Sequence, residues 1–124
     1  MMDELLKGLR ILIVEDNFVM ALDLSMMVEE LGGAVIGPAG RLDEGVALAE
    51  SNKLDGAILD VNLDGANTYF LADGLLAADV AVIFATGYDV KMLPERFALT
   101  PKLSKPFSAV TVEKALREAF SDRL

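Results

Sequence analysis

Residues 10–16 read Arg-Ile-Leu-Ile-Val-Glu-Asp, a short aliphatic run that ends abruptly in two acids. The run has the length of a buried β-strand, because a strand covered on both faces is apolar throughout instead of alternating. Four more segments of strand length follow, at 34–36, 57–59, 80–85 and 99–103. Segments with the apolar spacing of helices lie between most of them, which predicts a parallel sheet covered by helices on both sides.

The order of these segments predicts a flavodoxin-like, doubly wound (βα)5 three-layer sandwich with strand order 2-1-3-4-5. Residues 1–124 are expected to form a single domain, because this length fits one core. Ser108 is expected to cap the last helix through its hydroxyl. The fourth helix is expected to be short or irregular, because Pro94 interrupts its only candidate segment, 89–97.

Composition excludes several classes of function. The formal net charge of −9 argues against a nucleic-acid-binding surface, which needs clustered Lys and Arg. The absence of Cys and His excludes disulfides, thiolate chemistry, His-ligated zinc and imidazole bases. No stretch approaches 18 uncharged apolar residues, so neither secretion nor membrane spanning is expected, and we expect a cytoplasmic protein.

Polar residues follow the predicted strands at the edge where such a sheet binds ligands. Glu15 and Asp16 follow the first strand, Asp60 the third, Thr86 the fourth and Lys105 the fifth. Three carboxylates at one edge repel each other unless a cation lies among them, and Mg²⁺ prefers such oxygen ligands. A hydroxyl and an ammonium group nearby would complete a site for phosphoryl transfer.

Two other ligands can be tested against the same residues. The stretch 60–65, Asp-Val-Asn-Leu-Asp-Gly, looks like the start of an EF-hand loop, but the twelfth position is Leu71 instead of Glu, and the preceding segment is a strand. A flavin would need a phosphate-binding loop after the first strand, where Glu-Asp-Asn would repel a phosphate. The sequence therefore favours neither calcium nor flavin binding.

The set Glu15, Asp16, Asp60, Thr86 and Lys105, in this order on these strand ends, resembles the receiver domain of bacterial response regulators. The resemblance covers almost the whole chain. It implies that Asp60 accepts a phosphoryl group from a phosphohistidine on a sensor histidine kinase. It also implies that Thr86 bonds one phosphoryl oxygen and that Lys105 pairs with another.

The resemblance further implies a Mg²⁺ site and a particular backbone geometry. Asp16 and Asp60 would be direct ligands, the backbone carbonyl of Asn62 a third, and Glu15 would act through water. The peptide bond between Lys105 and Pro106 is expected to be cis, which shapes the loop that presents the lysine.

A narrower resemblance rests on the stretch 84–88, Phe-Ala-Thr-Gly-Tyr, with Leu-Pro-Glu-Arg-Phe at 93–97 and Lys-Pro-Phe at 105–107. These residues are similar to the FAT GUY receivers, usually single-domain proteins that work with kinases of the HWE type in alphaproteobacteria. Such a protein would act through a downstream protein or a phosphotransfer partner, as a monomer or weak dimer.

The chain departs from ordinary receivers at Lys102, where they usually carry an aromatic residue three positions before the lysine. That ring ordinarily moves inward when the threonine engages phosphate. Tyr88, two residues after Thr86, could take over part of this role or gate water, or it could be a partly exposed loop residue.

Three classes of function remain to be compared. A phosphorylation-dependent switch would catalyse only its own phosphorylation and dephosphorylation, and would not be an enzyme acting on an external substrate. A constitutive protein-binding module with the same fold would need neither the acids nor Thr86 and Lys105. A phosphatase of the haloacid dehalogenase type would need a second Asp two residues after Asp60, where Asn62 stands.

Overall fold

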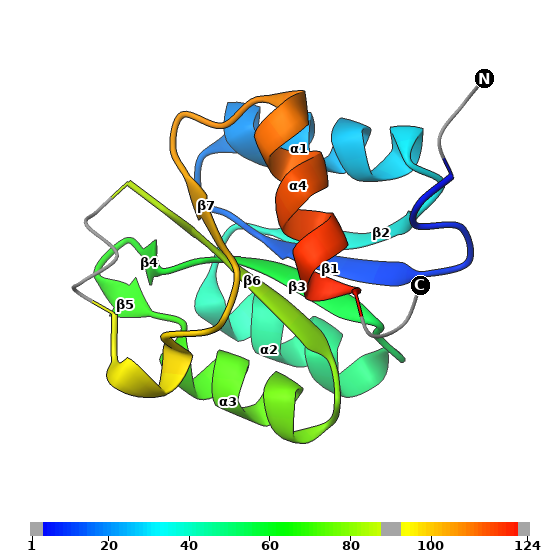
Figure 1. Ribbon diagram of the computed structural model, residues 1–124. Helices are drawn as coiled ribbons and strands as arrows, with labels where there is room; N and C mark the ends of the chain where they lie inside the picture. Colours follow the sequence, from blue (N-terminus) through cyan, green and yellow to red (C-terminus); the bar gives the residue numbers. More distant parts are fainter. Residues whose placement is uncertain (1–3, 88–92, 122–124) are drawn as a thin grey trace.

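Strands and helices alternate along the chain in the computed structural model, which describes residues 4–87 and 93–121. In chain order the elements are β1 (Arg10–Val14), α1 (Phe18–Glu30), β2 (Ala34–Ala39), α2 (Leu42–Ser51), β3 (Gly56–Asp60), β4 (Asn62–Leu63), β5 (Ala66–Asn67), α3 (Tyr69–Ala77), β6 (Ala81–Thr86), the 3₁₀ turn η2 (Glu95–Phe97), β7 (Lys102–Ser104) and α4 (Ala109–Ala119). Figure 1 shows a central sheet with helices on both of its faces.

The main sheet has five parallel strands in the order β2-β1-β3-β6-β7. This confirms the predicted order 2-1-3-4-5, because β6 and β7 are its fourth and fifth strands. Every residue of β3 and β6 is buried, as expected for strands that are apolar throughout and lie inside a doubly wound sheet.

The helices form one layer on each side of the sheet: α1 and α4 on one face, α2 and α3 on the other (Figure 1). Successive residues of a strand point to opposite faces. In β1, Ile11 and Ile13 therefore pack with α1 and α4, whereas Leu12 and Val14 pack in the cluster of α2 and α3. Two apolar cores result, and they hold the carboxyl ends of the strands in fixed positions.

The connection from β6 to β7 contains the irregular fourth helix that Pro94 predicts. In the described part of this connection, 93–101, the only helical element is η2, which follows Pro94 directly. Its Phe97 is buried against two rings, with centroid distances of 4.9 Å to Phe84 and 5.7 Å to Tyr69. One aromatic side chain thus anchors the turn to the core beneath β6.

The fifth strand begins later than predicted, at Lys102 instead of residue 99. Leu99 is 97% exposed, and the N–H of Thr100 donates to the carbonyl of Phe97, so these residues continue the turn. The prediction of a strand over 99–103 was therefore wrong at its first three residues. An apolar side chain and a following proline resemble a strand end, although here they belong to a loop.

Lys102 holds this turn in place. Its ammonium group donates to the carbonyl oxygens of Phe97 at 2.6 Å and Ala98 at 2.8 Å. The carbonyl of Phe97 also accepts from the N–H of Thr100, and the lysine adds a charged donor at this end of the turn, where carbonyls favour a cation. The residue that replaces the usual aromatic therefore has a structural contact of its own.

A two-stranded hairpin lies between β3 and α3. Its strands β4 and β5 are joined by Asp64 and Gly65, with φ angles of 48° and 91°. Positive φ at both central residues is typical of the tight hairpin turn that Asp-Gly favours. Residues 60–65 thus form a strand end and a hairpin instead of a calcium loop between helices.

The ends of α4 and α1 are capped by side chains. The hydroxyl of Ser108 accepts from the N–H of Thr111, and the hydroxyl of Thr111 accepts from the N–H of Ser108, which confirms the predicted cap. Asn17 caps α1 by accepting from the N–H of Met20 at 3.0 Å. No helix among the described residues has the length and apolar character needed to cross a membrane.

Candidate functional site

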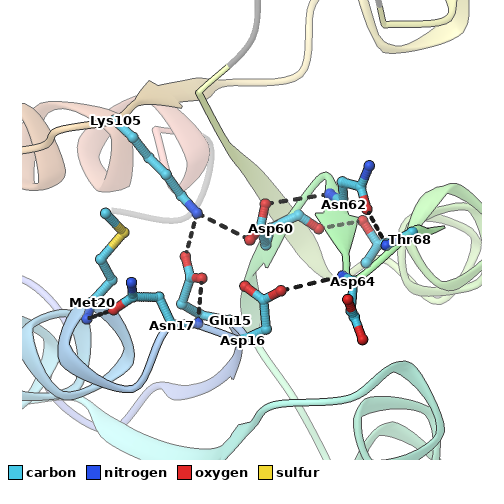
Figure 2. A network of polar contacts seen from close by, with 10 residues as sticks. Glu15, Asp16, Asn17, Met20, Asp60, Asn62, Asp64, Thr68 and Lys105 are labelled. Atoms are coloured by element: carbon cyan, nitrogen blue, oxygen red, sulfur yellow. Dashed lines mark hydrogen bonds and ion pairs between the residues drawn. The ribbon is translucent and has the colours of Figure 1, made fainter.

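The carboxyl ends of four strands bring the predicted polar residues to one edge of the sheet. Glu15 and Asp16 follow β1, Asp60 ends β3, Thr86 ends β6, and Lys105 follows β7. Figure 2 shows Glu15, Asp60 and Lys105 converging, with Asp16 beside them. The structure thus brings these acids and the lysine together at one edge of the sheet.

Lys105 joins the two buried acids of the site. Its Nζ lies 2.7 Å from Glu15 Oε1 and 3.0 Å from Asp60 Oδ2, and its side chain is only 17% exposed. Burial lowers the pKa of this ammonium group, but the bonds to Glu15 and Asp60 outweigh burial and the net shift is upward. The lysine therefore stays charged, and its peptide bond to Pro106 is cis, as expected.

Glu15 is almost completely buried, and both of its carboxylate oxygens have close partners. Its Oε2 accepts from the N–H of Asn17 at 3.0 Å, and Oε1 forms an ion pair with Lys105 Nζ at 2.7 Å. Burial raises the pKa of Glu15, and the charge of Asp60 raises it further, although Lys105 and Asn17 act in the opposite direction. A buried carboxylate is costly unless positive charge lies beside it, and Lys105 supplies that charge here.

Asp16 is the exposed acid of the site and contacts the β4–β5 hairpin. Its Oδ2 accepts from the backbone N–H of Asp64 at 3.2 Å. The N–H of Asn62 donates to Asp60 Oδ1 at 3.3 Å, and the Asn62 side chain accepts from the N–H of Gly65 at 2.9 Å. The hairpin thus contacts both Asp16 and Asp60. An open cleft here is lined by Asp16, Asp60, Asn62, Asp64, Gly65, Gly87 and Lys105.

The residues of this cleft fit a hard divalent cation. One carboxylate oxygen from each of Glu15, Asp16 and Asp60 can be chosen so that all three lie within 4.8 Å of one another. The donors are all oxygen, and one of them, Asp16, faces solvent, which suits an ion that keeps several waters. The acidic cluster could therefore bind Mg²⁺. The backbone carbonyl of Asn62 as a further ligand stays a prediction.

Thr86 lies at the same edge, as the last residue of β6. It is buried, and its carbonyl accepts from the N–H of Lys105 at 3.0 Å, which ties the end of β6 to the lysine loop. Phe84, Ala85 and Thr86 form the end of β6. Tyr88, the candidate for a switch role, lies outside the described residues.

Sequence reasoning missed two residues of the site. Thr68 is completely buried, and its hydroxyl donates to the backbone carbonyl of Asp60 at 2.7 Å. Asp64 places a fourth carboxylate at the mouth of the cleft. The Asp-Gly dipeptide at 64–65 is a hairpin signal that could have revealed the turn, whereas Thr68 has no signal beyond that of an ordinary residue before a helix.

Comparison with known proteins identifies relatives that are regulatory proteins. No family model matches the chain. The phyllosphere-induced regulator PhyR of Methylorubrum extorquens is 37% identical over an alignment of 118 positions that covers 88% of this chain and 42% of PhyR. The chain thus spans less than half the length of this curated relative.

Among solved structures, one relative is matched over nearly all of its own chain. SdrG from Sphingomonas melonis Fr1 is 36% identical, with a TM-score of 0.82 over 94% of this chain and 98% of SdrG. The chain belongs to the response-regulator receiver domains. The BeF3-activated conformation of SdrG is also similar to this chain, with 35% identity and a TM-score of 0.76 over 95% of this chain and 98% of the SdrG chain. Since its relatives are regulators, this receiver domain is a signalling module.

Proposed function

We propose that the receiver domain, residues 1–124, is a phosphorylation-dependent switch whose phosphate acceptor is Asp60. The observation that supports this most is the position of Asp60 between Lys105 Nζ at 3.0 Å and two further carboxylates able to share a cation. A lone strand-end acid would not need a half-buried lysine and a buried Glu15 beside it. The solved BeF3-activated conformation of SdrG supports the same interpretation, since BeF3 is a small analogue of a phosphoryl group.

The chemistry assigned to Asp60 is one displacement at phosphorus. A carboxylate oxygen of Asp60 forms a bond to phosphorus while the bond from phosphorus to the phosphohistidine nitrogen breaks. The imidazole leaves as a neutral ring when its other nitrogen carries a proton. Hydrolysis by water later returns the carboxylate and inorganic phosphate, so the domain acts only on itself.

Lys105 and Thr86 are assigned to the transferred group, and the acids to the cation. The Lys105 ammonium, which already contacts Asp60, would pair with a phosphoryl oxygen, and the Thr86 hydroxyl would donate to another. Asp16, Asp60 and the carbonyl of Asn62 would hold Mg²⁺ directly, with Glu15 acting through water. When bound, Mg²⁺ supplies positive charge against the phosphoryl oxygens.

A sensor histidine kinase is the proposed phosphoryl donor. Helix α1 begins two residues after Asp16 and exposes a row of apolar side chains, Phe18, Leu22 and Met26, at one-turn spacing. Such a face, which begins two residues from Asp16 of the acceptor cleft, suits an apolar helix of a partner that brings a phosphohistidine to Asp60. Output would then pass to a downstream protein or a phosphotransfer partner.

The test uses the whole chain and a small phosphodonor, which needs no partner. Acetyl phosphate with Mg²⁺ should add one phosphoryl group to the wild type, measured by intact mass, and none to Asp60→Asn. Asp23→Asn, which removes an exposed carboxylate of α1, is the matched control and should be labelled like the wild type. Equal labelling of Asp60→Asn would exclude Asp60 as the acceptor. No adduct and no Mg²⁺-dependent spectral change in the wild type would favour a constitutive binding module.

A further inference from the structure

Thr68 connects the start of α3 to the backbone of the proposed phosphate acceptor. Its side chain is completely buried, and the hydroxyl donates to the carbonyl oxygen of Asp60 at 2.7 Å (Figure 2). Its own N–H donates to the carbonyl of Val61 at 3.1 Å. Two hydrogen bonds from one residue therefore hold two successive carbonyls at the end of β3.

The position of Thr68 would ordinarily give its hydroxyl another task. Thr68 is the N-cap residue of α3, where a threonine side chain usually accepts from an N–H of the first turn. Here the side chain makes no such bond, and the cap residue contributes only its carbonyl, which accepts from the N–H of Ala72. The hydroxyl is directed at Asp60 instead, and the helix forgoes the stabilisation of a side-chain cap.

The end of the strand explains why the Asp60 carbonyl needs this donor. Directly after β3, the N–H of Val61 donates to the carbonyl of Ala85 in β6. The backbone groups of Asp60, one residue earlier, therefore point to the opposite side, toward β1. The last pair between β1 and β3 joins Val14 to Leu59, and β1 ends there. The carbonyl of Asp60 therefore lies past the end of the ladder, in a buried place where a carbonyl must find a donor.

We infer that Thr68 is a positioning residue for Asp60: its hydroxyl fixes the peptide that carries the acceptor carboxylate. This inference rests on the proposed function, because it concerns the same carboxylate. The Asp60 side chain is held by Lys105 Nζ at 3.0 Å and by the N–H of Asn62 at 3.3 Å. A rotation of the peptide between Asp60 and Val61 would shift Asn62 relative to the carboxylate, and the Thr68 hydroxyl opposes that rotation.

The test compares substitutions that keep or remove the hydroxyl. Thr68→Ser keeps the donor, whereas Thr68→Val has nearly the same shape and lacks it. Urea unfolding first establishes that each variant is folded. Two properties are then measured: the initial rate of labelling by acetyl phosphate, and the dissociation constant for Mg²⁺ from the shifts of backbone amide NMR signals at the cleft.

We expect Thr68→Val to be labelled about five- to tenfold more slowly than the wild type, the factor that one hydrogen bond of ordinary net strength represents. Its Mg²⁺ dissociation constant should rise by about tenfold, as is common when a group that orients a metal ligand is lost. Thr68→Ser should stay within about twofold of the wild type in both. If Thr68→Val does not fold, Thr68→Ala takes its place with the same expected losses relative to Thr68→Ser.

The two measurements separate this inference from the proposed function. A folded hydroxyl-free variant that matches Thr68→Ser in both properties overturns the positioning role of Thr68 and leaves the role of Asp60 intact. A wild type that binds Mg²⁺ but takes no phosphoryl group overturns the proposed function, and the Mg²⁺ constants alone then decide on Thr68. A wild type that does neither overturns both.

Discussion

Lys102 offers the sharpest test of how the connection between β6 and β7 is held. Its ammonium group donates to the carbonyls of Phe97 and Ala98, at 2.6 Å and 2.8 Å, and these end the turn η2. Lys102→Met keeps the length and apolar character of the side chain while it removes the donor. If the contact holds the turn, this change should lower the stability of the whole domain, because Phe97 is part of the core.

The expected size follows from the environment of each bond. A hydrogen bond from a charged donor contributes about 1.5–3 kcal/mol when it is sheltered from water. The bond to Phe97 is partly buried, whereas that to Ala98 is exposed, where water can replace the lost donor. Burial lowers the pKa of Lys102, so removing the charge also relieves some desolvation cost. The net loss should be about 1–2 kcal/mol, or a fall in Tm of roughly 3–10 °C for a chain of this size.

Urea unfolding followed by circular dichroism measures this difference. Lys114→Met is the matched control, since it removes the same charge from an exposed position of α4, and surface changes of this kind usually stay within about 0.5 kcal/mol. A free energy of unfolding for Lys102→Met that equals that of Lys114→Met would refute the reasoning. It would mean that the two carbonyls are satisfied equally well without the ammonium group, by water and, at Phe97, by the N–H of Thr100.

Three further predictions concern the cleft and its hairpin. Burial raises the pKa of Glu15 above its ordinary 4.5, so the folded wild type loses stability as pH rises from about 4.5 through the raised value. In the absence of divalent cations, the free energy of unfolding of Glu15→Gln should therefore increase relative to that of the wild type between pH 4 and 7, by about 1.4 kcal/mol for each pKa unit by which burial raises the value. Equal pH profiles of the two proteins in urea unfolding would contradict this. Asp64→Asn should increase the rate of labelling by acetyl phosphate about two- to threefold at low ionic strength, because it removes a negative charge from the cleft, and this gain should disappear at high salt. Asn is chosen because it tolerates the positive φ of this position. Gly65→Ala should lower the free energy of unfolding by about 1 kcal/mol because φ is +91°; no atom lies within 4 Å of the added Cβ, so a steric clash would not explain the loss. Gly74→Ala, in helix α3 and equally free of contacts, should raise it by about 0.5–1 kcal/mol. Similar effects of the two substitutions in urea unfolding would argue against a conformational origin.

The sheet and its acidic edge could be predicted because both depend on short-range patterns. Strands buried on both faces are apolar throughout, and the acids at 15, 16 and 60 end two of them. Once the strands are parallel, their carboxyl ends must share an edge, so Lys105 also had to lie near Asp60. What the pattern could not specify is that one ammonium group reaches both Glu15 and Asp60, because this depends on how the individual side chains extend from their strand ends.

The errors and omissions arise from hydrogen bonds that the apolar pattern does not encode, some of them local to one turn and one of them dependent on where a neighbouring strand ends. Residues 99–101 look like a strand, but the N–H of Thr100 pairs with Phe97 and continues the turn. The role of Lys102 depends on where that turn ends. Thr68 has the sequence of an ordinary N-cap, and only the end of β1 beside β3 leaves the Asp60 carbonyl for it to bond.

The charges of the cleft limit how Asp60 can react. Even without Asp64 at the mouth of the cleft, Glu15, Asp16 and Asp60 face one ammonium group, so with all three ionised they leave roughly two excess negative charges. A phosphoryl donor brings further negative charge, and like charges about 4 Å apart near a protein surface repel by about 4 kcal/mol. Monovalent salt acts through a screening length of about 8–10 Å at ordinary concentrations, which is too long to separate groups held within 4.8 Å of one another. Labelling of Asp60 should therefore require a divalent cation, and replacing Mg²⁺ by sodium chloride of equal ionic strength should not restore it. Equal labelling in the two salts would mean that Lys105 alone offsets the repulsion and that the acids have no cation to share.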